Sequence, residues 1–429
     1  MNNENASCAY DGEENAQLSP LQRLPMEIFL HICSFLDGST LIHGLSLVCT
    51  RFYLILKDAN SLWKARINHM WPDASWLLRP ARPDKLSLML SYVAIKQQTA
   101  LWKQQESTKK RNYLFIEKSP DRFADDAVLL MHVNGISHLV YTNSQHLLYK
   151  QLPSREKLSH EMENSASIKF AHDSGSCIRD LTAIDNTIYS CSFDTVKSWG
   201  LTNTGFIHQR IYDLRRSDNL HSLLWCMSSC PERNLFATGS SCGTIYVFDS
   251  RSRNNPIMHY RPHTKLVNIL AMNTEYILFA SRSVDDHTMS VWDQRAGRTM
   301  KSITFPGEAR PTCINMQRDL VFVGTWNKYS SKLHVLNPKD DFKLVKSYST
   351  KHTESITRVH LTHGCLITSS MDGTVRISSL TDPPEPIATL RSEIGCIYNM
   401  DYLNDTLAVC GYTGIEVWCP KLTCSTKQQ

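Results

Sequence analysis

From about residue 126 onward, the chain alternates short apolar runs with turn residues. The clearest unit is Ile188–Trp199, which reads as an apolar strand, a turn and an alternating strand that ends in an aromatic residue. This pattern predicts a β-hairpin. Clear copies recur at Leu235–Asp249, Phe279–Asp293, Leu366–Ile377 and Leu407–Trp418, and weaker copies lie at Leu139–Lys150 and Leu320–Val335.

The hairpin units recur at an almost constant interval. When the last strand of each unit is aligned on one residue, the successive steps are 50, 49, 44, 43, 42 and 41 residues. A period of about 40–45 residues, with one hairpin and flanking strands per period, is that of a β-propeller blade. The sequence therefore predicts seven blades, anchored on Tyr149, Trp199, Phe248, Trp292, Val335, Ile377 and Trp418.

A propeller must also close its ring. Trp418 stands near the end of the chain, so the last blade lacks an outer strand, and the strand-like segment 112–117 (NYLFIE) comes just before the first blade. We expect this segment to pair beside Gly414–Trp418, because the pairing closes the ring and covers an exposed sheet edge.

The N-terminal part of the chain has a helical pattern instead. Ile28, Ile32, Phe35 and Leu36 fall on one helix face, and Pro25 suits the first turn of that helix. A glycine stop and a new N-cap follow at residues 37–40, before a second amphipathic segment. A unit of about 45 residues buries little apolar surface alone, so we expect it to need a partner surface.

These patterns predict a multidomain chain, in which a small all-α domain and a helical linker precede an all-β propeller of seven blades. In the linker, apolar residues such as Leu86, Met89, Leu90 and Val93 recur at helical spacing. The predicted bounds are a disordered N-terminus at 1–20, the all-α domain at 21–66, the linker at 67–111, the propeller at 112–420 with its closing strand at 112–117, and a tail at 421–429.

Residues 21–66 resemble the F-box. The similarity lies in the order Leu-Pro-x-Glu-Ile, Ile-x-x-Phe-Leu, Val-Cys-x-x-Phe and Leu-Trp, with all positions in one register. This resemblance implies docking on a Skp-type adaptor held by a cullin–RING ubiquitin ligase. A plain bundle of core helices is the alternative. The implied adaptor-binding residues are Leu24, Pro25, Ile28, Ile32, Leu36, Val48, Cys49, Phe52 and Trp63.

The repeats resemble the WD-repeat family. In that family, a His–Asp–Ser/Thr–Trp network of hydrogen bonds lies inside a blade, and no His here follows a Gly as the family pattern has it. We therefore interpret the matching residues as structural rather than catalytic, and we expect some blades to depend more on packing. The matching residues are His172, His263, His352, Asp194, Asp372, Trp199, Trp292 and Trp418.

Together, residues 21–420 resemble the F-box/WD-repeat substrate receptors of SCF (Skp–cullin–F-box) E3 ubiquitin ligases. The segments Thr368–Ile377, Thr381–Pro384 and Ile415–Trp418 are most similar to the ninth-numbered subfamily. The resemblance implies a non-catalytic adaptor whose propeller binds a substrate protein for ubiquitination. It implies no cofactor, and it leaves the substrate, its degron and the oligomeric state open.

The substrate is expected on the propeller face formed by the starts of the inner strands and the hairpin turns. An alignment on the turn aspartates, good to one or two residues, puts Arg179, Trp225, Asn268, Thr357 and Tyr398 at the starts of the inner strands. Together with the residues just before the turns, these positions are aromatic, apolar and neutral apart from one arginine, so we predict a mainly unphosphorylated contact. Some relatives read phosphopeptides with clustered arginines, and Arg282, Arg310 and Arg358 would change the prediction if loops brought them together. The predicted substrate-binding residues are Arg179, Phe193, Trp225, Met371, Tyr398 and Tyr412, and the alternative is that several of them pack between blades.

Composition excludes several other classes of function. The 429 residues carry 46 basic and 41 acidic side chains, a net charge of +5, without the basic stripe of a nucleic-acid binder. No apolar run of about 18 residues predicts a membrane span, and the N-terminal residues lack a signal-peptide pattern. We therefore expect the protein in the cytoplasm, the nucleus or both, with its 14 cysteines as reduced thiols.

Two motifs could be mistaken for functional signals. Gly239–Gly243 matches Gly-x-Ser-x-Gly, but a strand follows it rather than the helix that a nucleophile elbow needs, so we interpret it as a hairpin turn. Trp292–Arg295, and less well Phe248–Arg251, resemble the Trp-Asp-x-Arg signature of receptors on the damaged-DNA-binding adaptor of another cullin ligase. Such a receptor, or a scaffold without a ligase role, remains an alternative function. The sequence shows no metal-ligand spacing.

Overall fold

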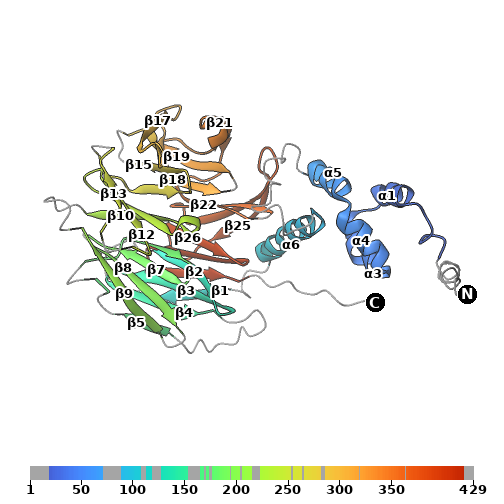
Figure 1. The fold of residues 1–429 in the computed structure, drawn as a ribbon, viewed down its shortest axis with the longest axis horizontal. Coiled ribbons are helices and arrows are strands. Elements are labelled where there is room, and N and C mark those ends of the chain that lie inside the picture. The colour runs from blue at the N-terminus through green and yellow to red at the C-terminus, as the bar shows by residue number, and fades with distance from the viewer. Residues whose placement is uncertain are drawn as a thin grey trace, which may run out of the picture. The chain divides into compact units, whose positions relative to one another are not determined.

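The computed structural model describes residues 19–70, 88–107, 113–117, 127–152, 165–168, 171–172, 176–193, 195–202, 205–214, 223–252, 255–262, 265–281, 286–317, 319–362 and 364–419. The chain divides into two units. The first comprises Met1–Gln98 with Leu380–Pro383, and the second comprises Thr99–Ser379 with Pro384–Gln429. Figure 1 traces the chain in colour, from the blue N-terminal helices to the red strands of the last blades.

Short helices make up the described part of the first unit up to residue 70. Each of the two short helical turns α2 and α3 has three residues, and between them the backbone forms a π-helix. The elements are α1 (Met26–Phe35), α2 (Gly38–Thr40), the π-helix η2 (Leu41–Leu45), α3 (Ser46–Val48), α4 (Thr50–Asp58) and α5 (Asn60–Met70), and α6 (Leu88–Ser107) begins in this unit and ends in the second.

Aromatic side chains form the core of the first unit. Phe29 stacks on Phe52 with ring centroids 4.5 Å apart, and Trp63 lies 5.3 Å from Tyr92 of α6. The indole N–H of Trp63 donates to the Leu56 carbonyl at 2.6 Å, which satisfies its only polar group in a fully buried position. The N-terminus of α2 is capped, because the Asp37 carboxylate accepts hydrogen bonds from the Ser39 and Thr40 N–H groups.

The described strands of the second unit form seven four-stranded antiparallel sheets, as the seven-blade prediction requires. Two short 3₁₀ turns interrupt the hairpins, η4 (Pro231–Arg233) and η5 (Pro338–Asp340). In blade order, the strands are β2 (Val128–Val133), β3 (Ile136–Asn143), β4 (His146–Gln151) and β5 (Ser165–Ile168); β6 (Asp180–Ile184), β7 (Thr187–Cys191), β8 (Thr195–Thr202) and β9 (Gly205–Asp213); β10 (Leu224–Cys230), β11 (Leu235–Ser240), β12 (Ile245–Asp249) and β13 (Met258–Tyr260); β14 (Ile269–Met272), β15 (Tyr276–Ala280), β16 (Thr288–Asp293) and β17 (Arg298–Thr304); β18 (Arg310–Gln317), β19 (Leu320–Asn327), β20 (Ser330–Asn337) and β21 (Lys343–Ser349); β22 (Ile356–Leu361), β23 (Cys365–Ser370), β24 (Thr374–Ser379) and β25 (Pro386–Arg391); and β26 (Ile397–Leu403), β27 (Thr406–Gly411), β28 (Gly414–Trp418) and β1 (Tyr113–Glu117).

The last blade closes the ring as predicted. Strand β1 pairs antiparallel with β28, with Tyr113 opposite Trp418 and Glu117 opposite Gly414. The first strands of successive blades are neighbours around the ring, and β26 is the neighbour of β2. The seven residues on which the repeats were aligned all lie in the third strand of their blade. One repeat period therefore corresponds to one whole blade. Residues 1–18, 71–87, 108–112 and 420–429 lie outside the described part, so the predicted tail, most of the N-terminus and part of the linker are not tested.

The core of the propeller lies between blades, where apolar strand faces meet. Strands of blades two and three contribute one such cluster, with Tyr189, Tyr212, Phe236 and Phe248 at its centre. The C-terminal end of α6 joins another cluster. Its Trp102 is fully buried, and its ring centroid lies 6.4 Å from that of Tyr402 in the last blade.

Hydrogen-bond networks inside two blades confirm the structural interpretation of the histidines. In blade two, His172 bonds Ser190 at 2.8 Å and Thr195 at 2.9 Å, and the Trp199 indole N–H donates to the same Ser190 hydroxyl at 2.9 Å. Blade six has a second network around His352, without a tryptophan. Asp194 and His263, which the sequence also assigned to such networks, lie outside the described residues.

Polar side chains also link the inner strands of neighbouring blades. The Asp180 carboxylate in blade two accepts from the Met227 N–H of blade three at 2.9 Å. The Ser228 hydroxyl accepts from the Met272 N–H of blade four at 3.1 Å. At the ring closure, the Asp401 carboxylate accepts from the Leu130 N–H of blade one at 2.6 Å. These bonds satisfy inner-strand backbone groups that face a neighbouring blade rather than a ladder partner.

The ring-closing Asp401 makes the stability of the propeller depend on pH. Burial raises the pKa of its carboxyl to about 6, against the opposing effect of hydrogen bonds from the Leu130 and Tyr402 N–H groups. A raised folded-state pKa gives stability that is fully present below the unfolded value near 4 and is lost as pH rises through about 6. As the pH rises from 4 to 7.5, we expect the free energy of unfolding of Asp401→Asn to increase by about 2–3 kcal/mol relative to that of the native chain.

Urea unfolding midpoints at a series of pH values would measure this gain. The matched control is Asp185→Asn on an exposed turn, whose pH profile should follow that of the native chain. Parallel profiles for Asp401→Asn and the native chain would contradict the prediction.

Candidate functional site

The N-terminal unit exposes one apolar face of α1. Ile28 is 49% exposed, Ile32 is 39% exposed and Phe35 is 77% exposed, and they recur at helical spacing. We call these three residues the α1 apolar face. The core-facing side of α1 is carried by Phe29 and Cys33, which are buried. Since one apolar side of this helix packs on the core, its other apolar side is available to a partner.

Further apolar residues are exposed on the neighbouring helices. Leu47 and Val48 of α3 are 75% and 63% exposed, and Met26 at the start of α1 is 52% exposed. The sequence analysis included Val48 but missed Leu47, Met26 and Phe35 as contact candidates. The sequence feature that could have identified Leu47 is its position next to Val48. Adjacent residues of a helix point in different directions, so at most one of the two suits a narrow side facing the core.

Two of the predicted adaptor-binding residues lie in the core of the first unit. Phe52 is 2% exposed and Trp63 is fully buried, so both belong to the core and cannot contact a partner directly. Of the remaining predicted residues, Pro25 is exposed as the N-cap of α1, whereas Leu24, Leu36 and Cys49 are half-buried.

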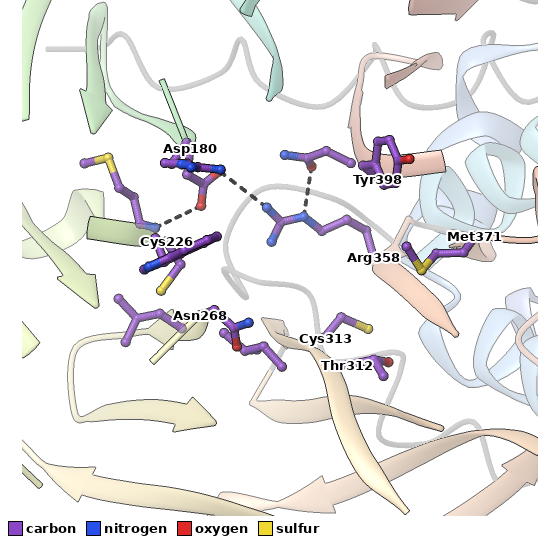
Figure 2. Close-up of a pocket in the computed structure, with 14 residues that line it drawn as sticks. Asp180, Cys226, Asn268, Thr312, Cys313, Arg358, Met371 and Tyr398 are labelled. Carbon is purple, nitrogen blue, oxygen red and sulfur yellow. Dashed lines mark hydrogen bonds and ion pairs between the residues drawn. The ribbon is translucent and has the colours of Figure 1, made fainter. Parts of the chain in front are cut away.

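In the second unit, the inner strands surround a pocket of about 260 Å³ (Figure 2). Four of the six predicted substrate-binding residues line it, namely Arg179, Trp225, Met371 and Tyr398. The guanidinium of Arg179 lies 4.5 Å from the Trp225 ring centroid and 5.5 Å from that of Phe193. Phe193 therefore contributes by stacking on Arg179 and is not itself part of the lining.

Tyr412 is not one of the residues that line this pocket. It follows β27 and is 61% exposed. Its exposure leaves it open to a partner, and it is close enough to the lining residue Tyr398 to contribute to the raised pKa of that residue, which burial mainly causes. Of the arginines that could have changed the substrate prediction, Arg282 lies outside the described residues, and Arg310 is not a lining residue.

Arg358 lines the pocket, one position after the residue that the sequence alignment put there. The alignment put Thr357 at this position, but Thr357 is 3% exposed and bonds the Ser369 hydroxyl at 2.9 Å. A β-bulge lies between Ile356 and Arg358, but it does not explain the difference, because the residues at the same place in other blades, Trp225, Thr312 and Tyr398, do line the pocket. The first strands of blades three, five and seven are irregular at the corresponding place.

Figure 2 shows Arg358 extending across the pocket toward Asp180. Its Nη2 lies 3.5 Å from the Asp180 carboxylate of blade two, and its Nε donates to the Asn399 side-chain oxygen at 2.9 Å. Blades two and six are distant in the ring, so this contact spans the central opening. The pocket therefore combines aromatic surface with two cations and one carboxylate.

The motifs that resemble functional signals have local structural roles. Ser240 of Gly239–Gly243 is fully buried, and its hydroxyl accepts from the Thr244 N–H at 3.0 Å in the turn between two strands. The Asp293 carboxylate accepts from the Arg295 and Ala296 N–H groups at 2.8 Å, which shapes its own turn. Asp249 pairs with Arg251 at 3.0 Å. Among the described residues, no group of histidine, cysteine and acidic side chains could hold a metal ion.

Comparisons with known proteins agree with this arrangement. The F-box-like family matches residues 21–68, and the WD domain, G-beta repeat family matches residues 214–249 and 342–377. The chain is 25% identical to the human F-box/WD repeat-containing protein 9, over 93% of this chain and 82% of that protein. It is 24% identical to the F-box/WD repeat-containing protein mec-15 of Caenorhabditis elegans, over 78% of this chain and 79% of that protein.

A solved structure supports the fold alone. A chain in the crystal structure of the mitotic checkpoint complex matches with a TM-score of 0.57 at 13% identity, over 72% of this chain and 91% of that chain. No described helix is long and apolar enough to cross a membrane.

The chain thus has an F-box-like domain followed by a WD-repeat propeller, the architecture of the F-box/WD-repeat proteins. The predicted similarity to the ninth-numbered subfamily is confirmed by the human and bovine relatives, each at 25% identity over 93% of this chain. The combination of an F-box-like match with WD-repeat matches implies a substrate-receptor role in SCF-type ubiquitin ligases, and the F-box-like match implies binding of a Skp-type adaptor in general.

Proposed function

We propose that this protein is the substrate-recognition subunit of an SCF E3 ubiquitin ligase. The α1 apolar face carries the proposal, because it is an exposed hydrophobic surface on the segment that matches the F-box-like family. In this proposal Ile28, Ile32 and Phe35 dock on the Skp-type adaptor, which the cullin–RING ligase holds. Pro25, Leu47 and Val48 extend that contact, while Phe29, Phe52 and Trp63 keep the helices in place.

The propeller would hold the substrate protein at its central pocket. Trp225, Met371 and Tyr398 offer aromatic and flexible apolar surface, which is the kind of surface that anchors protein partners. Phe193 supports Arg179, and Tyr412 adds an exposed contact. The protein would act without catalysing a reaction itself, because holding a substrate near the ligase raises its effective concentration.

We place this activity in the cytoplasm, the nucleus or both. The described cysteines are free thiols, and most of them are buried or half-buried, as expected of a protein in a reducing compartment. Neither a nucleic acid nor a membrane is part of the proposal.

Affinity purification from cells tests the proposal. The full-length chain and a truncated chain lacking residues 1–70 would be purified side by side, with quantification of each cullin recovered. We expect the Skp-linked cullin with the full-length chain only. Recovery of the other cullin branch with both chains would favour the damaged-DNA-binding adaptor, and recovery of no cullin would favour a scaffold.

A further inference from the structure

The charges in the propeller pocket indicate which chemical group it takes. Among the described lining residues, the charged side chains at neutral pH are Arg179, Arg358 and Asp180. Their sum is one net positive charge inside a partly closed cavity. A pocket of this kind attracts an anion, and the number of charges sets how much negative charge it can match.

Asp180 is a fixed part of the pocket wall. Its carboxylate accepts from the Leu181 N–H at 3.0 Å and from the Met227 N–H at 2.9 Å, and its side chain is 7% exposed. It cannot turn away without leaving backbone donors of two blades unsatisfied. Any ligand therefore meets a permanent negative charge beside the two arginines.

Arg358 has hydrogen-bonding capacity left for a ligand. Its Nη2 reaches Asp180 at 3.5 Å, longer than the 2.7–2.9 Å of a tight charge-assisted bond. Its Nε is used by Asn399, and Nη1 has no hydrogen-bond partner among the residues that the structure describes. The side chain is 37% exposed, so an incoming group can reach it.

Arg179 provides a second, oriented cation. Its guanidinium is held against the Trp225 and Phe193 rings, 4.5 and 5.5 Å from their centroids. Burial lowers the pKa of Arg179, which means that the pocket disfavours its isolated positive charge. A nearby anion offsets that cost.

We propose that the pocket takes a single carboxylate, the side chain of an Asp or Glu in an unphosphorylated segment of the substrate protein, with Arg358 as the residue that grips it. A carboxylate brings one negative charge and neutralises the pocket. A phosphoserine brings about −1.5 to −2, which leaves excess negative charge against Asp180. This inference rests on the proposed function, since it names the recognition chemistry of the same propeller.

Peptide libraries bound to the full-length protein test the inference. Immobilised random-sequence peptides would carry one fixed central residue, either Glu, Gln, phosphoserine or Lys. We expect the Glu library to retain at least 10-fold more protein than the Gln library, and more than the phosphoserine library. Equal retention by Glu and Gln, or strongest retention by phosphoserine or Lys, would overturn the inference.

Two variants sharpen the test. Asp180→Asn raises the net charge of the lining to +2. The ratio of binding to the phosphoserine library over the Glu library should therefore rise at least 10-fold in this variant. Arg358→Gln should lose the discrimination between Glu and Gln. The matched control is Arg391→Gln, an exposed arginine outside the lining, which should keep the native preference. An unchanged preference in Arg358→Gln would refute the role of that residue even if Asp180→Asn fails to fold.

Co-purification of the Skp-type adaptor with each variant separates this inference from the proposed function. Pocket variants should retain the adaptor fully. A native chain that prefers Glu peptides but recovers no adaptor would refute the proposed function and leave the pocket chemistry standing.

Discussion

Replacing Ile28 and Ile32 together by aspartate is expected to abolish adaptor binding while both units of the chain stay folded. The two side chains are 49% and 39% exposed, so the new carboxylates remain in water in the free protein. In a complex they would be buried without partners, at a cost of several kcal/mol. We expect the affinity for a purified Skp-type adaptor to fall at least 100-fold, about 3 kcal/mol.

Titration of the adaptor against the full-length chain would measure the loss, and circular dichroism would report the fold. The control is Ile207→Asp, which changes a comparably exposed isoleucine (56%) on β9 and should bind the adaptor normally. If Ile28→Asp with Ile32→Asp unfolds the helices, these residues are core and the α1 apolar face is not an interface. Adaptor binding that is retained by a folded variant would also contradict the proposed docking surface.

Replacing His352 by alanine is expected to destabilise the propeller by about 2–4 kcal/mol. The His352 ring is fully buried and bonds the Asp372 carboxylate at 3.1 Å, the Thr374 hydroxyl at 3.1 Å and the Thr368 hydroxyl at 2.9 Å. Truncation removes all these bonds at once. It also strands Asp372, whose side chain is 7% exposed, without its main partner.

Chemical unfolding of the native and variant chains would measure this loss. His259→Ala is the control, because His259 is exposed on β13 and its removal should change stability by less than about 0.5 kcal/mol. A loss for His352→Ala no larger than for the control would show that blade six is held by packing alone.

The same network predicts a dependence on acid. Burial alone would raise the pKa of Asp372, but hydrogen bonds from His352 and Thr374 outweigh it and hold the pKa well below its usual range. A depressed folded-state pKa gives stability that is present above the unfolded value near 4 and is lost as pH falls below it. We expect Asp372→Asn to be less stable than the native chain at pH 7 and to approach it in acid, where unfolding midpoints would converge.

Local pattern was enough to predict the repeat architecture. The hairpin units, their spacing and the ring-closing segment 112–117 follow from strand and turn chemistry that acts within about 45 residues. The F-box was also readable, because its apolar positions recur within single short helices. The His172 and His352 networks could be assigned in advance because each lies within one blade.

Residues whose role depends on distant parts of the chain were harder to assign. Phe52 and Trp63 look like contact residues in the F-box motif, yet packing between helices makes them core. Thr357 was expected in the pocket, but its hydroxyl bonds that of Ser369, and Arg358 lines the pocket instead. Which of two neighbouring residues reaches the pocket depends on how the strands pack together, and the pattern of a single strand does not show this.

By itself, the sequence determined the two kinds of domain, the seven blades and the resemblance to F-box/WD-repeat receptors, because hydrophobic periodicity and turn residues act locally. Only the tertiary structure decided which apolar side of α1 remains exposed, and which charges meet in the propeller pocket. Arg358 and Asp180 are 178 residues apart in the chain and come together solely because the ring closes. Recognition chemistry of this protein therefore depends on contacts that form after the blades assemble.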